Sequence, residues 1–290
     1  MWINFFKYLN YNIIISSPSN KKILENGSKL SNDESCLSLK LFLGHILDLK
    51  DKCDLIFIPR LFSIKKEEQV CTNFNCLYDL TKNLIDIKLI HYNIDLTKNK
   101  TKLKAFIDLG EQLGESYINS YKAYKYAIKT SNKIRKEKEL TQEKKLKTNN
   151  LKILLAAHPY NLYDNLIGKT IINYLEKNNI TIIYSDCIKK ELIDSECKKI
   201  SKDIHWTHSK EVIASINYYQ DKVDGIINIS SFPCGPDSLS NEMIKHKIKD
   251  IPLITLIFED LNSETGIITR LESFIDILQN IKEKKNATNY

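Results

Sequence analysis

Cysteine is the residue type with the clearest chemical potential in this chain of 290 residues, which contains seven of them. Three stand just ahead of segments with helical periodicity: Cys36, Cys71 and Cys234. A helix N-terminus favours a thiolate, because its dipole and free N–H groups stabilise negative charge. Thiolates in such places suit iron–sulfur ligation. Their spacing matches no compact ferredoxin motif, so unrelated free thiols are the simpler interpretation of the spacing alone.

The other four cysteines have simpler, structural explanations. Cys53 and Cys76 are predicted to be small buried hydrophobic residues. Cys187 and Cys197 could join His205 and His208 in a zinc site, but nine residues separate the two cysteines, more than a zinc knuckle uses. Seven is an odd number, and in the reducing, cytoplasmic setting expected for this protein the cysteines are not expected to form a disulfide framework.

Nucleotide-binding and hydrolase motifs are missing. The string GKT at 168–170 lacks the first glycine of a Walker A loop, since Tyr163 stands at that position. No G-x-G-x-x-G and no G-x-S-x-G occurs in the sequence. A dinucleotide site of the usual kind and a nucleophile elbow are therefore both disfavoured.

The net charge of +7 is concentrated in two segments. Residues 130–150 hold seven Lys or Arg and three Glu, and residues 281–285 hold three Lys and one Glu. We interpret them as a solvated connector and a tail rather than as a nucleic-acid-binding face. No apolar run is long enough to span a membrane, and the first residues lack the features of a signal peptide.

The second half of the chain alternates strand and helix patterns. Apolar runs rich in Ile and Leu predict buried strands, each followed by a helical pattern, at 151–157, 180–185, 224–230 and 252–258. Strands buried on both faces and joined by helices indicate a parallel sheet. Asp237 or Ser238 is the predicted N-cap of the helix after Cys234, and Gly235 suggests a close backbone approach.

The first half shows a similar alternation. Strands are expected at 11–17, 54–61 and 87–94, helices at 36–49 and 77–85, and a long helix from Thr101 toward the basic connector. The predicted fold is α/β, with two doubly wound parallel-sheet domains of the Rossmann-like or flavodoxin-like kind, at 1–148 and 149–290, and a cleft between them. Functional residues are expected where strands end, in the loops 17–36, 60–76, 158–165, 231–237 and 259–266.

Five strings in these regions carry a family resemblance: SSPSNKKILENGSKLSNDESCLSLKLFLGHILDL, FIPRLFSIKKEEQVCTNF, AAHPYNLYD, SSFPCGPDSL and ETGIITRLESFIDIL. With them the chain resembles the uncharacterised family related to 2-hydroxyacyl-CoA (2-hydroxyglutaryl-CoA) dehydratases and their ATP-dependent activases. The resemblance implies a [4Fe–4S] or related cluster held by three cysteines, which would be Cys36, Cys71 and Cys234. The chain departs from the family at Ser38, where relatives carry Pro, and at Cys76, where they rarely carry cysteine. Relatives also have a further strand ahead of the position at which this sequence starts.

The matching loops also mark neighbours of such a site. His158 is the candidate proton carrier, because the pKa of histidine lies near neutrality, and Glu264 is a second catalytic candidate. The remaining neighbours are expected to contact the cofactor or support its loop: Pro159, Tyr160, Asn161, Asp164, Gly235, Asp237, Ser238, Thr265 and Gly266.

The resemblance implies an iron–sulfur protein that accepts low-potential electrons from an activase of the sugar kinase/Hsp70/actin type, in the manner of a 2-hydroxyacyl-CoA dehydratase subunit. An acyl-CoA substrate and a dimer are further expectations. Two alternatives stay open. One is a reductase of another small substrate that uses the same activase, and the other is a cluster-free scaffold that binds the activase.

Overall fold

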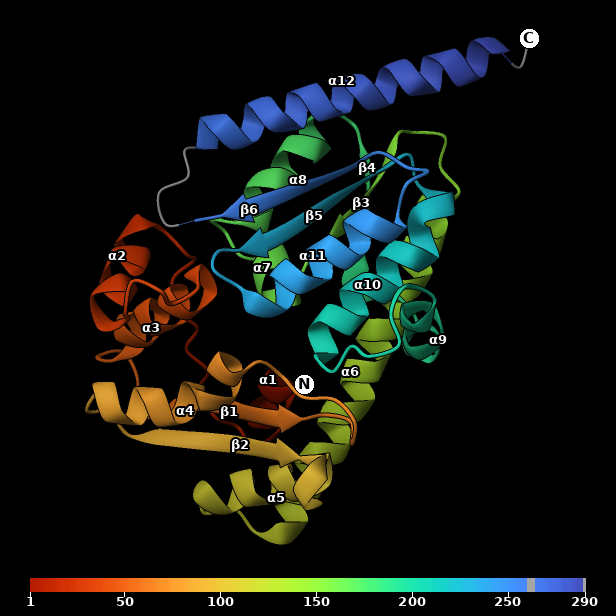
Figure 1. Cartoon of the computed structure of the whole chain (residues 1–290). Coiled ribbons are helices and arrows are strands. Elements are labelled where there is room, and N and C mark those ends of the chain that lie inside the picture. The colour runs from red at the N-terminus through yellow and green to blue at the C-terminus, as the bar shows by residue number, and fades with distance from the viewer. Residues whose placement is uncertain (260–263, 289–290) are drawn as a thin grey trace. The chain divides into compact units, whose positions relative to one another are not determined.

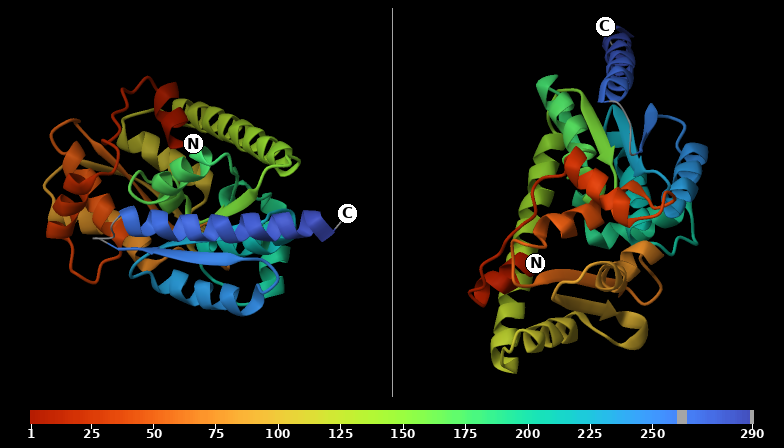
Figure 2. Two further views of the ribbon diagram at one scale, coloured as in Figure 1. Left: turned by 90° about the horizontal axis from the view of Figure 1, so that it is seen from above. Right: turned by 90° about the vertical axis from the view of Figure 1, so that its left-hand side faces the viewer.

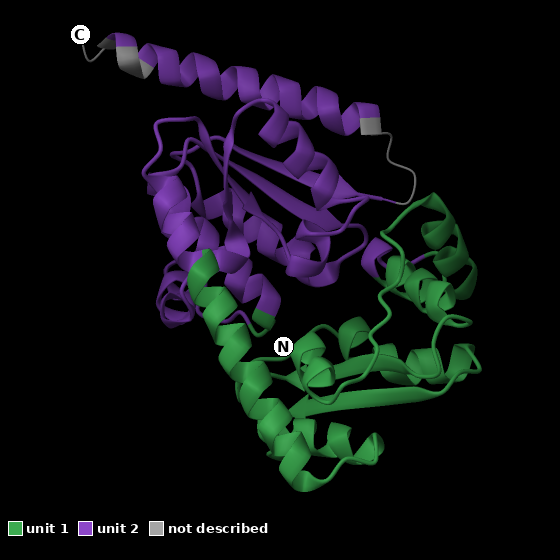
Figure 3. Cartoon of the chain, turned by 180° about the vertical axis from the view of Figure 1, so that it is seen from behind, with its two compact units in different colours: residues 1–33, 39–138, 205–207 green, residues 34–38, 139–204, 208–290 purple. Residues whose placement is uncertain are grey.

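The structure is a computed structural model that describes residues 1–259 and 264–288, apart from the side chains of residues 264, 285, 286 and 288 (Figure 1). The chain forms two compact units, coloured separately in Figure 3. Unit 1 consists of residues 1–33, 39–138 and 205–207, and unit 2 of residues 34–38, 139–204 and 208–290. Unit 2 therefore takes a short segment from the N-terminal part of the sequence.

Unit 2 is built on a four-stranded parallel sheet. Its strands run in the order β4-β3-β5-β6 and comprise Lys152–Ala156 (β3), Thr181–Tyr184 (β4), Gly225–Ser231 (β5) and Leu253–Phe258 (β6). All seven residues of β5 are buried, as expected for a central strand covered on both faces. The four strands that the apolar runs predict are confirmed.

Helices cover both faces of this sheet. The helices of unit 2 are Pro159–Leu162 (α7), Gly168–Lys177 (α8), Lys190–Ile200 (α9), Thr207–Tyr219 (α10), Gly235–Lys247 (α11) and Glu264–Thr288 (α12). Ile226 of β5 packs in one core cluster with Ile213 of α10 and Ile244 of α11. The neighbouring Gly225 faces Leu278 of α12, because successive strand residues point to opposite faces. Figure 2 shows α8 and α11 on opposite sides of the strands, so unit 2 is doubly wound.

Unit 1 has a smaller sheet. Its elements are Trp2–Tyr8 (α1), Lys21–Leu30 (α2), most of Leu37–Leu49 (α3), Ile56–Ser63 (β1), Thr72–Leu84 (α4), Leu89–Asp95 (β2), Lys102–Gln112 (α5) and the first part of Tyr117–Leu146 (α6). Strands β1 and β2 pair in parallel and form a two-stranded sheet. Its core cluster contains apolar and aromatic side chains of α1, β1, β2, α5 and α6, together with Val70.

The prediction of a strand at residues 11–17 is wrong, and with it that of a doubly wound sheet in the first half. This segment forms neither helix nor strand, and Ile14 and Ile15 are exposed. The N–H of Ser17 is bonded to the Asp48 carboxylate at 2.7 Å rather than to a neighbouring strand. An apolar run alone cannot distinguish a strand from such a connecting segment, because pairing depends on a partner distant in sequence.

The single long helix expected from Thr101 is divided in two. Gly114 adopts a positive φ of 76° just after α5, a conformation that glycine tolerates and other residues rarely adopt. Helix α6 then runs on to Leu146, so most of the predicted solvated connector is helical.

Within unit 2, buried Gln142 donates to the carbonyl of Tyr184 and accepts from its N–H, at 2.8 and 2.7 Å. The amide of Gln142 fixes the last turns of α6 onto β4.

Within the described residues, no helix is both long enough and apolar enough to span a membrane. The cleft predicted between two domains stays a prediction.

Candidate functional site

The carboxyl edge of the unit 2 sheet gathers the chemically active side chains. Strands β3 and β5 are neighbours in parallel, with Ile153 opposite Gly225, so both end at the same edge. His158 follows the end of β3 by two residues, and Cys234 follows the end of β5 by three. This is where ligands bind in open parallel sheets.

His158, Cys234 and Asp237 form a compact cluster at this edge. One potential ligand atom from each lies within 4.8 Å of the other two. His158 Nε2 lies 2.5 Å from Asp237 Oδ1, and both side chains are buried. The side chain of Asp237 reaches His158 because Cys234 is the N-cap of α11 and Asp237 lies three residues further, in its first turn. Asp237 and Ser238 are therefore not the N-cap, and the helix begins earlier than predicted.

Burial raises the pKa of the Cys234 thiol, and the Asp237 carboxylate and Cys36 raise it further. The sequence-based expectation was the reverse, since a helix N-terminus favours a thiolate. Desolvation and a neighbouring negative charge outweigh the helix end. A cation bound at the thiol would reverse this balance, because it replaces the proton.

Cys36 belongs to unit 2, since residues 34–38 are anchored at the same edge. The N–H of Leu37 donates to the carbonyl of Phe232 at 3.0 Å. Ser38 Oγ and Ser231 Oγ both donate to Asn161 Oδ1, at 2.7 and 2.9 Å. These bonds hold the Cys36 segment against the loops that carry His158 and Cys234. Sequence reasoning missed this role for Ser38 and Ser231; a serine ending the apolar strand was the available signal.

Cys71 lies in unit 1, at the N-cap of α4. Its Sγ accepts a hydrogen bond from the N–H of Phe74 at 3.4 Å, and the side chain is half-buried. All three candidate ligands thus directly precede a helix, and α4 and α11 begin closer to their cysteines than predicted. Cys36 and Cys234 share unit 2, whereas Cys71 belongs to the other unit.

The other predicted neighbours have mixed surroundings. Tyr160 stacks on His158, with ring centroids 5.2 Å apart, and His208, which sequence analysis did not assign here, contacts the same ring edge-on at 5.8 Å. Ser238 is exposed and its hydroxyl donates to the Cys234 carbonyl. Nothing lies within 4 Å of a Cβ built on Gly235, so the close approach expected there is not present.

Three predicted site residues lie at the start of α12. Thr265 and Gly266 are exposed in the first turn of α12. The side chain of Glu264 lies outside the described residues. Pro159 begins α7, and the carboxylate of Asp164 accepts a hydrogen bond from the N–H of Leu166 at 2.8 Å, so both have local structural roles.

The remaining cysteines are bystanders of this cluster. The prediction that Cys53 and Cys76 are buried is wrong, since Cys76 is exposed and Cys53 is only half-buried. Cys76 lies on the outer face of α4, where helical periodicity turns it away from buried Leu77. Cys187 and Cys197 are buried, and the one group of three metal-capable side chains found among the described residues includes neither.

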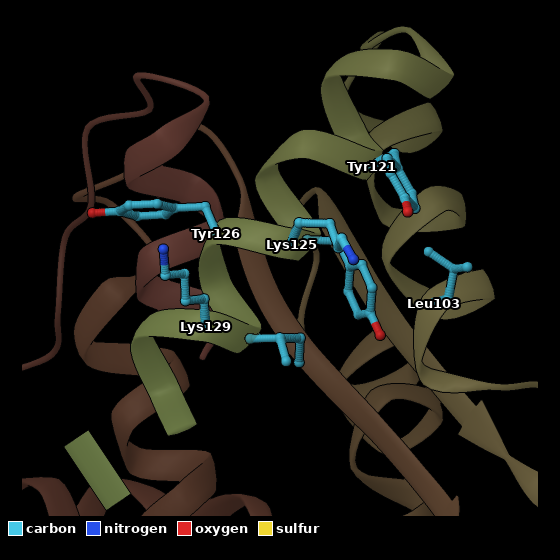
Figure 4. A pocket seen from close by; sticks show the side chains of 7 residues that line it. Leu103, Tyr121, Lys125, Tyr126 and Lys129 are labelled. Carbon is cyan, nitrogen blue, oxygen red and sulfur yellow. The ribbon is translucent and has the colours of Figure 1, made fainter. Parts of the chain in front are cut away.

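A separate surface pocket of about 480 Å³ lies in unit 1 (Figure 4). It is lined by Leu103, Tyr121, Tyr124, Lys125, Tyr126, Ile128 and Lys129. Tyr126 and Lys129 project from α6, and Lys125 Nζ lies 5.9 Å from the centroid of the Tyr121 ring. None of these residues is a predicted site residue.

The fold and the cluster define an α/β protein with a group of potential metal ligands at the carboxyl edge of a parallel sheet. Residues 1–188 match the family model described as the CoA enzyme activase uncharacterised domain (DUF2229). The chain belongs to this activase-related family, and the resemblance noted in its sequence is confirmed. The matched region contains Cys36, Cys71 and His158, whereas Cys234 and Asp237 follow it. A search of curated proteins finds no match.

Proposed function

We propose that this protein is an iron–sulfur component that works with an ATP-dependent activase and holds a [4Fe–4S]-type cluster through Cys36, Cys71 and Cys234. The observation that carries the proposal is the anchoring of Cys36 in unit 2, at the sheet edge that also carries Cys234. The two cysteines are separated by most of the chain, yet hydrogen bonds of Leu37 and Ser38 hold the first beside the loop of the second.

The donor set fits such a cofactor chemically. Thiolates are the usual ligands of iron–sulfur clusters, and main-chain N–H groups at helix N-termini donate to the sulfurs. Each of the three cysteines directly precedes a helix, α3, α4 or α11. A bound cluster would supply a one-electron carrier with one iron free of protein thiolate.

The neighbouring side chains fit a role in proton handling. Asp237 Oδ1 is bonded to His158 Nε2, which orients the imidazole and favours the tautomer that carries its proton on Nε2. Tyr160 stacks on one face of the ring and restricts its rotation. We propose that His158 carries a proton to or from a substrate at this edge and that Asp237 positions it. The substrate class that we propose is an acyl-CoA thioester, by analogy with the dehydratases that the family resembles.

Anaerobic reconstitution tests the cluster. We expect the wild-type protein, given iron and sulfide, to bind about four irons and four sulfides per chain, with an EPR signal after reduction. Replacing Cys36, Cys71 or Cys234 with Ser should lower the iron content and change the EPR spectrum. Cys53→Ser and Cys187→Ser are the matched controls and should behave as wild type.

A wild-type protein that takes up no sulfide would contradict the proposal. If in addition the triple variant of Cys36, Cys71 and Cys234 still bound the activase, the cluster-free scaffold would be the better description. Assays of a reconstituted protein with 2-hydroxyacyl-CoA substrates separate a dehydratase from a reductase of another substrate.

A further inference from the structure

The cluster of His158, Cys234 and Asp237 has unused bonding capacity. Nδ1 of His158 and Oδ2 of Asp237 are buried, and neither has a hydrogen-bond partner among the described residues. The relative exposures of these two side chains are 4% and 7%. Leaving a buried polar atom without a partner is unfavourable, because the atom loses its hydrogen bonds to water and gains none, so native proteins rarely do so without a reason.

The unpartnered atoms are electron-pair donors. If Asp237 is ionised, it accepts the proton of His158 Nε2, and Nδ1 then carries a lone pair. Oδ2 of the same carboxylate also carries lone pairs, and the Cys234 sulfur lies in the same cluster. A cation that replaces the proton shared by Nε2 and Oδ1 would be bound by those two atoms together with the Cys234 sulfur, and the unpartnered Nδ1 and Oδ2 belong to the same two side chains.

We propose that unit 2 binds a single divalent transition-metal ion of the zinc or ferrous class through Cys234, His158 and Asp237. A sulfur ligand disfavours Mg²⁺ and Ca²⁺, which take oxygen ligands, whereas mixed sulfur, nitrogen and oxygen donors suit Zn²⁺ and Fe²⁺. Three protein ligands leave a fourth tetrahedral position open, as in catalytic zinc sites.

The three donors are positioned by rigid elements. Cys234 and Asp237 occupy the N-cap and the first turn of α11, so one helix end presents both. His158 follows the neighbouring strand β3, and its ring is held by Tyr160 and His208. A metal–ligand bond is about 2.0–2.3 Å long, so atoms within 4.8 Å of one another need only small movements to share one ion.

This site goes beyond the proposed cluster because it does not use Cys71 and needs no sulfide. The single-ion site and the cluster site share Cys234, so a single ion and a cluster are alternative occupants of the same sheet edge. The single ion requires His158 and Asp237, whereas the cluster requires Cys71 and sulfide, so either proposal can fail while the other stands.

Cobalt titration of the full-length, metal-free, reduced protein tests the inference, with Co²⁺ as a spectroscopic probe and Zn²⁺ as competitor. We expect one Co²⁺ per chain, an absorption band from sulfur-to-cobalt charge transfer, and displacement by one equivalent of Zn²⁺. Cys234→Ser should abolish that band. Asp237→Asn and His158→Gln should each weaken binding at least about tenfold.

Two control variants replace a histidine and a cysteine that lie outside the cluster of His158, Cys234 and Asp237. His246→Gln alters an exposed histidine of α11, and Cys71→Ser removes a cysteine of unit 1. Both should bind Co²⁺ as wild type does. The inference is overturned if the wild type binds no Co²⁺, if Asp237→Asn and His158→Gln bind as tightly as wild type, or if Cys71→Ser abolishes binding. Circular dichroism of each metal-free variant establishes that it is folded. If a variant is not folded, Co²⁺ binding by the wild type decides whether the site exists.

Discussion

At the scale of single residues, the surroundings of a side chain decide its chemistry more than its position in the sequence does. Cys36, Cys71 and Cys234 all directly precede a helix and are all partly buried, and at Cys234 desolvation and the neighbouring Asp237 carboxylate raise the pKa of the thiol. The Asp237 carboxylate that raises the pKa of this thiol also lies beside His158, so a cation at this edge would be close to both the thiol and the carboxylate.

Asp48 provides a residue-level prediction of pH dependence. The carboxylate accepts hydrogen bonds from Lys52 Nζ and from the N–H of Ser17, both at 2.7 Å, and these lower its pKa from 3.8 to about 2. Because the folded-state pKa is depressed, the resulting stabilisation is fully present above the unfolded pKa of 3.8 and is lost as the pH falls toward about 2. Asp48→Asn should therefore unfold at a lower temperature than wild type at pH 6, with a difference that disappears near pH 2.

Melting temperatures measured at several pH values between these limits would check the Asp48 prediction. The exposed Asp51→Asn variant serves as control and should melt as wild type does throughout. A gap between wild type and Asp48→Asn that stayed constant down to pH 2 would show that the carboxylate is not stabilised in the folded state.

At the scale of elements, helices α2 and α3 pack closely against each other through two glycines. A Cβ built on Gly27 would lie 1.7 Å from the carbonyl oxygen of Lys40, and one on Gly44 would lie 1.9 Å from that of Ile23. The two helices can approach so closely because neither Gly27 nor Gly44 has a side chain between them. Neither glycine adopts a positive φ, so space and not backbone conformation requires them.

Gly27→Ala tests this packing. Alanine has a higher helix propensity by about 1 kcal/mol, but the clash with main-chain atoms should cost about 3 kcal/mol. The free energy of unfolding should therefore fall by about 2 kcal/mol in urea denaturation. Glu25→Ala, at an exposed position of the same helix, should change it by less than about 0.5 kcal/mol. A Gly27→Ala variant more stable than wild type would contradict the close approach.

At the scale of the whole molecule, sequence order and compact unit do not coincide. Residues 34–38 belong to unit 2, although unit 1 precedes and follows them in the chain, and residues 205–207 belong to unit 1. Ser38 is bonded to Asn161, 123 positions away, and its hydroxyl lies 3.0 Å from that of Ser231, 193 positions away. Distant segments of the chain therefore build one sheet edge.

Ser38→Ala should weaken this connection selectively. Loss of a hydrogen bond to buried Asn161 should cost unit 2 about 1 kcal/mol. Amide hydrogen exchange at β5 and α7 should become faster, whereas the urea midpoint followed by tryptophan fluorescence should not change, because Trp2 and Trp206 both lie in unit 1.

An exposed serine of unit 2 is the control for Ser38→Ala. Ser195→Ala removes a hydroxyl that bonds within its own helix, to the carbonyl of Leu192, and should leave exchange at β5 unchanged. Unaltered β5 exchange in Ser38→Ala would mean that the hydroxyl does not hold the segment in place.

The sequence by itself determined the local features of this protein. Apolar runs and helical periodicity depend on neighbouring residues, so the four strands of unit 2, the strands β1 and β2 and the presence of a helix after each of the three cysteines were predictable. The starts of α4 and α11 were not, since both helices begin earlier than predicted. The long helix that reaches the basic connector was predictable too, although not its break at Gly114. The family resemblance added the ligand candidates and is confirmed by the matched region.

Only the tertiary structure decided which of these features meet. It left the apolar segment 11–17 outside any sheet, placed Cys36 in unit 2, and joined His158 to Asp237 across 79 positions. Such contacts depend on the burial and pairing of segments far apart in the chain, which no local pattern records. The same dependence on burial explains why the thiol of Cys234 has a raised pKa where its helix position alone predicted a lowered one.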